Sequence, residues 1–169
     1  MVTVRLASAA DADAIGRIQV ETWRAAYAGL MPDEAVAAFD VESRQQLWRE
    51  GLGRPPRAGS ATFVVEDAGE VVGFASVGAS REDGAVQEGE LYAIYLHPSC
   101  WDRGIGRALL LRAEESMRSS GFRRAILWVL EGNERAERFY EAAGWERDGR
   151  KLDRFQGADV TELSYRKRL

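Results

Sequence analysis

The chain has 169 residues, 46% hydrophobic and 30% charged, a composition typical of a folded domain rather than a disordered one. A net charge of −4 argues against a nucleic-acid surface, and one cysteine (Cys100) with one histidine (His97) argues against a disulfide framework and a metal site. No secretory leader follows Met1 and no window is apolar enough for a membrane span, so we expect one cytoplasmic domain over residues 1–169.

Periodicity in the first half predicts strands and helices in a mixed order. Alternating apolar residues favour strands, and a capping-box pattern followed by apolar residues at helical spacing favours a helix. In chain order we expect a strand at 2–6, a helix after 8–11, a helical region over about 33–52 broken near residue 40, and a hairpin of strands at 61–66 and 71–77.

The second half predicts a strand–helix–strand unit followed by a shorter helix. We expect a strand at 90–96, a helix after the glycines at 104 and 106, a strand at 124–130, a helix at 133–143 and two weaker strands. The predicted fold class is α/β of the α+β type. Its sheet is mixed and mostly antiparallel, with six to seven strands, at least one parallel crossover and about four flanking helices.

The turn before the second-half helix has the features of an anion site. Gly104 and Gly106 let the backbone approach a ligand, and the first helical turn offers unpaired N–H groups to a phosphate. Arg103 and Arg107 flank the turn and could add charge-assisted contacts. A P-loop needs lysine where Arg107 stands, and a dinucleotide fingerprint needs a small residue where Leu109 stands, so both are rejected. A plain helix cap would explain a bare Gly-x-Gly equally well.

The surrounding residues decide between these readings. The run Trp101-Asp102-Arg103-Gly104-Ile105-Gly106 resembles a known family signature, which reads Arg or Gln, two residues, Gly, one residue, then Gly or Ala. Trp101 stands where Arg or Gln is usual. A second motif of the same family, Asn-x-x-Ala-x-x-Phe-Tyr with a Gly-aromatic end, resembles the run from Asn133 to Trp145. From Glu90 to about Gly149 the chain therefore resembles the acetyl-CoA-binding core of the GNAT superfamily of N-acetyltransferases.

The resemblance implies acetyl-CoA as the acetyl donor, held largely by main-chain groups. It also implies that the strand around residues 94–96 pairs with the pantetheine arm and that the Leu96 N–H is a donor to the developing oxyanion. The expected cofactor-binding residues are Ile94, Tyr95, Leu96, Trp101, Asp102, Arg103, Gly104, Ile105, Gly106, Arg107, Ala108, Asn133, Arg135 and Tyr140.

Two residues are candidates for proton transfer. An alkyl ammonium has a pKa near roughly 10.4, so the acceptor amine must lose a proton, and a carboxylate can take it. Glu90 is our candidate base, expected to share a strand face with Tyr92, Ile94 and Leu96, and Glu88 is its competitor. By its place in the resemblance, Tyr140 is the candidate acid that protonates the leaving thiolate.

The acceptor side is less defined. Trp23 and Tyr27 lie four residues apart on the first helix, a spacing that core packing usually explains, but the resemblance makes this helix part of the acceptor pocket. With Glu90 and Tyr92 they are the expected substrate-binding residues. Three functions stay open: acetylation of a small-molecule amine, acetylation of a protein N-terminus or lysine, and a non-catalytic acyl-CoA sensor. The resemblance also implies that the late strands can mediate a homodimer.

Overall fold

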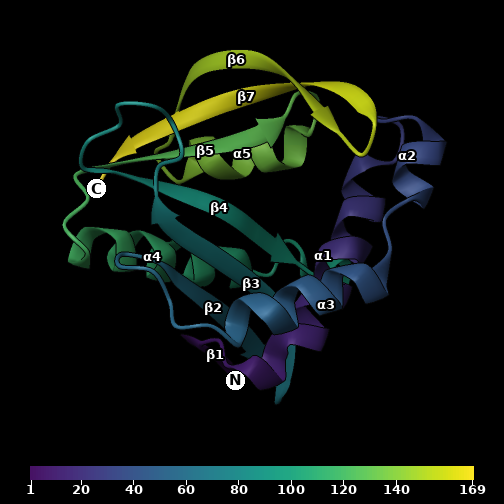
Figure 1. The fold of residues 1–169 in the computed structure, drawn as a ribbon, viewed down its shortest axis with the longest axis horizontal. Coiled ribbons are helices and arrows are strands. Elements are labelled where there is room, and N and C mark those ends of the chain that lie inside the picture. The colour runs from purple at the N-terminus through teal and green to yellow at the C-terminus, as the bar shows by residue number, and fades with distance from the viewer.

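The computed structural model describes residues 1–169 and contains one seven-stranded sheet (Figure 1). The strands are β1 (Val2–Leu6), β2 (Ala61–Asp67), β3 (Glu70–Ala79), β4 (Glu88–Leu96), β5 (Arg124–Leu130), β6 (Glu146–Phe155) and β7 (Ala158–Arg168). Their order across the sheet is β1-β2-β3-β4-β5-β7-β6, and every neighbouring pair is antiparallel except β4 and β5. The predicted fold class, with one parallel crossover, is confirmed.

Five α-helices accompany the sheet, one more than the sequence predicts. They are α1 (Ala12–Tyr27), α2 (Asp33–Ala37), α3 (Val41–Leu52), α4 (Ile105–Ser119) and α5 (Glu134–Ala142). The extra helix arises from the predicted break near residue 40, because the Asp40 carboxylate accepts a hydrogen bond from the Ser43 N–H at 2.7 Å and starts α3 afresh. None of the helices has the length and apolar character that crossing a membrane requires.

The helices form two layers, one on each face of the sheet (Figure 1). On one face, α1 buries Ile15 and Ile18 against Val64 and Phe74, and α3 packs over α1. On the other face, α4 buries its apolar stripe against β2 to β5 in the larger core cluster, which also takes in residues of α5. Each such side chain contributes roughly 1.5–3 kcal/mol of burial, so both layers hold the central strands firmly.

The parallel pair β4–β5 opens partway along its length. The two strands pair only over 88–91 and 124–127, after which β5 continues beside β7 while β4 has no strand partner on that side. A bulge lies at the same point, because Val77 of β3 pairs with Leu91 and Ser76 pairs with Ala93, leaving Tyr92 as the extra residue. A bulge bends its strand and increases the local twist, which accounts for the divergence of β4 from β5.

The bulge also changes which β4 side chains share a face. Ile94 and Leu96 pack into the cluster on the α4 side, whereas Ala93 and Tyr95 pack on the α1 side. Glu90 lines a cavity together with Ala93 and Tyr95, so the prediction that it shares a face with Ile94 and Leu96 is wrong. Strict alternation along a strand fails across a bulge because the extra residue shifts the count by one.

Candidate active site

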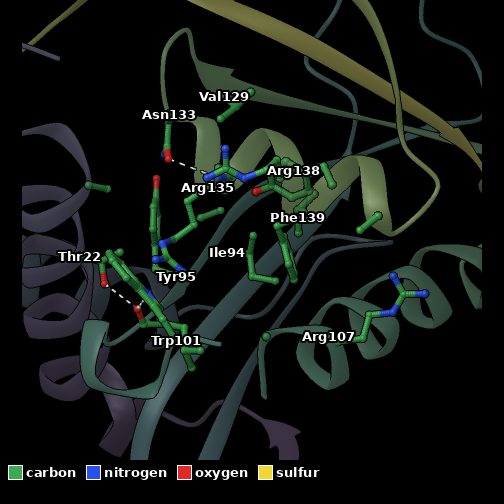
Figure 2. A pocket seen from close by; sticks show the side chains of 18 of the residues that line it. Thr22, Ile94, Tyr95, Trp101, Arg107, Val129, Asn133, Arg135, Arg138 and Phe139 are labelled. Carbon is green, nitrogen blue, oxygen red and sulfur yellow. Dashed lines mark hydrogen bonds between the residues drawn. The ribbon is translucent and has the colours of Figure 1, made fainter. Parts of the chain in front are cut away.

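A cavity of about 720 Å³ lies where β4 and β5 diverge, at the starts of α4 and α5 (Figure 2). Its lining comprises Thr22, Ala26, Tyr27, Leu91, Tyr92, Ala93, Ile94, Tyr95, Leu96, Trp101, Asp102, Gly104, Gly106, Arg107, Trp128, Val129, Asn133, Arg135, Ala136, Arg138, Phe139, Tyr140 and Ala142. We call this the donor cavity. Trp101 and Tyr95 lie at one end of it in Figure 2, and Arg107 lies at the other.

The glycine turn brings the N-terminus of α4 to the donor cavity. Gly104 caps the helix with φ of +75°, a left-handed conformation that glycine adopts without strain, and Asp102 before it has φ of +59°. The first N–H groups of α4 have no intrahelical acceptor, and Gly106 adds no side chain above them. Charged residues of the lining are three arginines and one aspartate. The site therefore fits a polyanion such as the phosphates of CoA.

Trp101, the atypical residue of the glycine motif, joins the turn to the end of β4. Its indole N–H donates to the Leu96 carbonyl oxygen at 2.7 Å, and the Thr22 hydroxyl donates to the same oxygen at 3.2 Å (Figure 2). The Arg135 guanidinium lies 4.6 Å from the Trp101 ring centroid and also pairs with Asp102 at 2.7 Å. These contacts link α1, β4, the turn and α5 at one end of the cavity.

Tyr140 is buried on α5 and lines the donor cavity. Burial raises the pKa of its hydroxyl well above the usual range, with a smaller effect from Tyr95. The hydroxyl therefore stays protonated at neutral pH, which is the state that a proton donor requires. Asn133 starts this helix, since its side-chain oxygen accepts from the Ala136 N–H at 3.3 Å.

A second cavity of about 840 Å³ lies on the α1 side of β4 and meets the donor cavity. We call it the acceptor cavity. The two share Tyr27, Leu91, Tyr92, Ala93, Tyr95 and Trp128 in their linings. The acceptor cavity is further lined by Gln19, Trp23, Arg81, Glu82, Asp83, Glu90, Leu130, Lys151, Asp153, Phe155, Val160 and Glu162.

Tyrosine hydroxyls lie at the junction of the two cavities. Burial raises the pKa of Tyr95, while the nearby Tyr27 side chain partly offsets this rise. Burial likewise raises the pKa of Tyr27 well above its usual range. Both groups are therefore neutral at the junction and can donate or accept hydrogen bonds there.

Glu90 is buried in the acceptor cavity with its carboxylate held by Arg81. One carboxylate oxygen accepts from the Arg81 guanidinium at 2.5 and 3.1 Å, and the other accepts from the Arg81 backbone N–H at 2.9 Å. The competitor Glu88 lines neither cavity, and its carboxylate pairs with Arg166 at 3.1 Å. Of these two acids, only Glu90 can reach a ligand in the acceptor cavity.

The structure brings most of the predicted site residues to these cavities, with three exceptions. Arg103 turns away from the donor cavity and pairs with Asp67 on β2 at 2.7 Å. Ile105 is buried in the core and Ala108 is exposed, and neither lines the donor cavity. Any part that these three play in binding would have to come from their main-chain groups.

Sequence reasoning missed lining residues on distant elements. Arg138 and Phe139 lie within the second motif and could have been found from its helical spacing. Lys151, Asp153 and Glu162 come from β6 and β7, where the sequence shows only scattered charge. Burial raises the pKa of Glu162 above its ordinary value, an effect that depends on the fold and has no sequence signal.

Comparisons with known proteins agree with this geometry. The family model of the acetyltransferase (GNAT) family matches residues 17–145. The uncharacterised N-acetyltransferase YuaI of Bacillus subtilis is 35% identical over 87% of this chain and 82% of its own length. A mycothiol acetyltransferase of Thermobispora bispora is 38% identical over 64% of this chain, which spans only 35% of that relative. The crystal structure of the PaiA N-acetyltransferase of Thermoplasma acidophilum in complex with coenzyme A covers 100% of this chain and 99% of its own, with 21% identity and a TM-score of 0.73.

The chain belongs to the GNAT family of acetyltransferases, because the family model covers most of its length and a relative 35% identical matches over most of both chains. It is therefore an acyltransferase that takes its acetyl group from acetyl-CoA. The cavity at the splayed strands, with its glycine turn and excess of arginines, fits that donor.

Proposed function

We propose that this enzyme moves the acetyl group of acetyl-CoA directly to a primary amine of a small molecule while both are bound. The observation that carries the proposal is the meeting of two cavities at six shared residues, one cavity suited to CoA and the other open to an acceptor. Bound acetyl-CoA supplies a thioester, an acyl group already activated for transfer to a nitrogen nucleophile. The protein then has to position two molecules and move protons.

The donor cavity offers distinct groups for the two ends of the cofactor. We propose that the N–H groups of the turn at 104–106, with the guanidinium groups of Arg107 and Arg138, bind the phosphates. The unpaired edge of β4 over 94–96 would bind the pantetheine arm in the manner of an added strand. On this view, Trp101 orients the turn relative to β4 through its bond to the Leu96 carbonyl.

Proton movement is assigned to two buried groups in different cavities. We propose that Glu90 accepts the proton of the attacking amine, directly or through a water molecule, while Arg81 holds the carboxylate in place. Tyr140 would donate a proton to the departing sulfur from the donor cavity. Trp23, Tyr27 and Tyr92 line the acceptor cavity and would orient the acceptor.

A small-molecule acceptor is favoured over a protein one by the walls of the acceptor cavity. Elements far apart in the chain converge on it, with side chains from α1, the loop before β4, β5, β6 and β7. The similarity to a mycothiol acetyltransferase is consistent with that choice. A cytoplasmic location and a homodimer formed through the late strands remain predictions.

The test is release of free CoA from acetyl-CoA against a panel of small amines and short peptides, with identification of the acetylated product. Turnover of small amines supports the proposal, and turnover of peptides alone would favour a protein acetyltransferase. If no amine is acetylated while acetyl-CoA still raises the unfolding temperature, the chain is a sensor.

The proton-donor role is tested with two matched variants. Tyr140→Phe should lower kcat by about 10²–10⁴-fold, the usual contribution of a positioned acid. Tyr165→Phe makes the same change at a buried ring 6.2 Å from Tyr140 that lines neither cavity, so kcat should be retained. Equal rates for Tyr140→Phe and the native enzyme would exclude Tyr140 as the acid.

A further inference from the structure

The two joined cavities carry opposite charge. The donor cavity is lined by three arginines and one aspartate, whereas the acceptor cavity is lined by five carboxylates and two cationic side chains. The positive cavity suits the phosphates of CoA, so the negative one is left for the acceptor. A single ammonium that must become neutral before it reacts does not account for so many carboxylates.

Both cations of the acceptor cavity are already engaged. Arg81 is bound to Glu90 through its guanidinium and its backbone N–H. Lys151 is shared between Asp153 at 3.5 Å and Glu162 at 3.4 Å. One lysine therefore faces two carboxylates, and this side of the cavity retains negative charge for a ligand.

The remaining carboxylates of the acceptor cavity lie on the loop before β4. Glu82 pairs with Arg166, whose side chain is outside the cavity lining, and Asp83 has no ion-pair partner. No basic side chain of the lining is left over to receive an anionic group of a ligand.

A second observation, independent of charge, marks the same cavity as a ligand site. The indole N–H of Trp23 is buried and is the one buried side-chain polar atom that has no hydrogen-bond partner in the protein. Trp23 forms part of the acceptor cavity wall, with the Phe155 ring 5.2 Å away. Buried donors are normally satisfied, so this one calls for an acceptor atom of a bound molecule, which the lone pair of the neutral reacting amine can supply and a charged ammonium cannot.

On the basis of the transferase function above, we propose that the acceptor carries at least two amino groups. One is acetylated at the junction of the cavities, and the second stays charged and is held by Asp83, Asp153 and Glu162. An α,ω-diamine or a longer polyamine has this chemistry. An amino acid does not, because its carboxylate would face the acidic side of the cavity.

The test compares three linear amines of equal length as acceptors: an α,ω-diamine, the n-alkyl monoamine and the ω-amino acid. We expect kcat/KM for the diamine to exceed that of the monoamine by at least about ten-fold, the scale of one charge-assisted contact, with the amino acid the poorest. The ratio of kcat/KM for the diamine to that for the monoamine should decrease as the salt concentration rises, because salt screens the interaction between charges. Equal or better turnover of the monoamine or the amino acid overturns the inference and leaves the transferase function standing. Failure to acetylate any amine overturns the function itself.

Two variants test whether the carboxylates of the acceptor cavity cause the preference for a diamine over a monoamine. Glu162→Gln and Asp83→Asn remove one charge each and should reduce the diamine-to-monoamine ratio of kcat/KM. Asp159→Asn, on the same strand as Glu162 but exposed and outside both cavities, is the matched control and should keep the ratio. An unchanged ratio in both cavity variants would contradict the assignment of the second amine to these carboxylates.

Discussion

Gly104 offers a sharp test of the turn that presents α4 to the donor cavity. Its φ of +75° is strained for any residue with a Cβ, and an added Cβ would meet nothing within 4 Å. Gly104→Ala therefore introduces backbone strain without a clash, at a cost of roughly 1–2 kcal/mol. Gly106 is the matched control for backbone strain, because it lies in the helix and a Cβ there would rest 3.5 Å from Phe139, an ordinary contact.

The strain of Gly104→Ala must be visible in either folding or binding. If the turn keeps its shape, the unfolding temperature falls by roughly 2–8 °C. If the turn relaxes, CoA has to restore it and its Kd rises by roughly 5–30-fold. Scanning calorimetry and titration calorimetry with CoA measure both, and the two losses should sum to the strain. Gly106→Ala should not lower the unfolding temperature, because alanine at a helical position favours the helix. A Gly104→Ala protein with native stability and native affinity would refute the reasoning.

Two further predictions concern the bulge and the N-terminal ion pair. A Cβ at Gly78 would overlap the Tyr92 ring and hydroxyl, so Gly78→Ala should displace a residue of both cavities and lower kcat/KM by about ten- to a hundred-fold in steady-state assays. Unchanged kinetics would show that Tyr92 does not position the acceptor. Arg5 lowers the pKa of Asp11 to about 2, so Asp11 stabilises the fold above its ordinary pKa of 3.8 and loses this effect as pH falls through 2. Urea unfolding should find Asp11→Asn weaker by about 1–2 kcal/mol at pH 7, with the difference shrinking below pH 4, and a pH-independent difference would contradict the ion-pair account.

The donor cavity could be predicted from the sequence because its parts are local. A glycine pair opening a helix and an asparagine starting the next one are set by capping chemistry within a few residues. The exception is Arg103, whose partner Asp67 lies on a hairpin far away in the chain. A flanking arginine in the sequence gives no sign of which way its side chain will point.

The acceptor cavity could not be predicted because it depends on the sheet as a whole. Glu162 reaches it only because β7 inserts between β5 and β6, an order that no local pattern encodes. Glu90 turns to the α1 side of β4 because of the bulge at Tyr92, which alternation along the strand does not reveal. Strand order and register are tertiary properties. Together they decide which of the candidate residues in the sequence reach the acceptor cavity.

Amide hydrogen exchange with and without CoA tests the central claim most directly, since that claim places acetyl-CoA between the diverging strands. We expect CoA to protect the amides of residues 92–96 on β4 and 104–107 at the start of α4. Residues of the acceptor cavity on β6 and β7 should exchange as before. Protection on β6 and β7 that leaves the turn and the β4 edge unchanged would contradict the account.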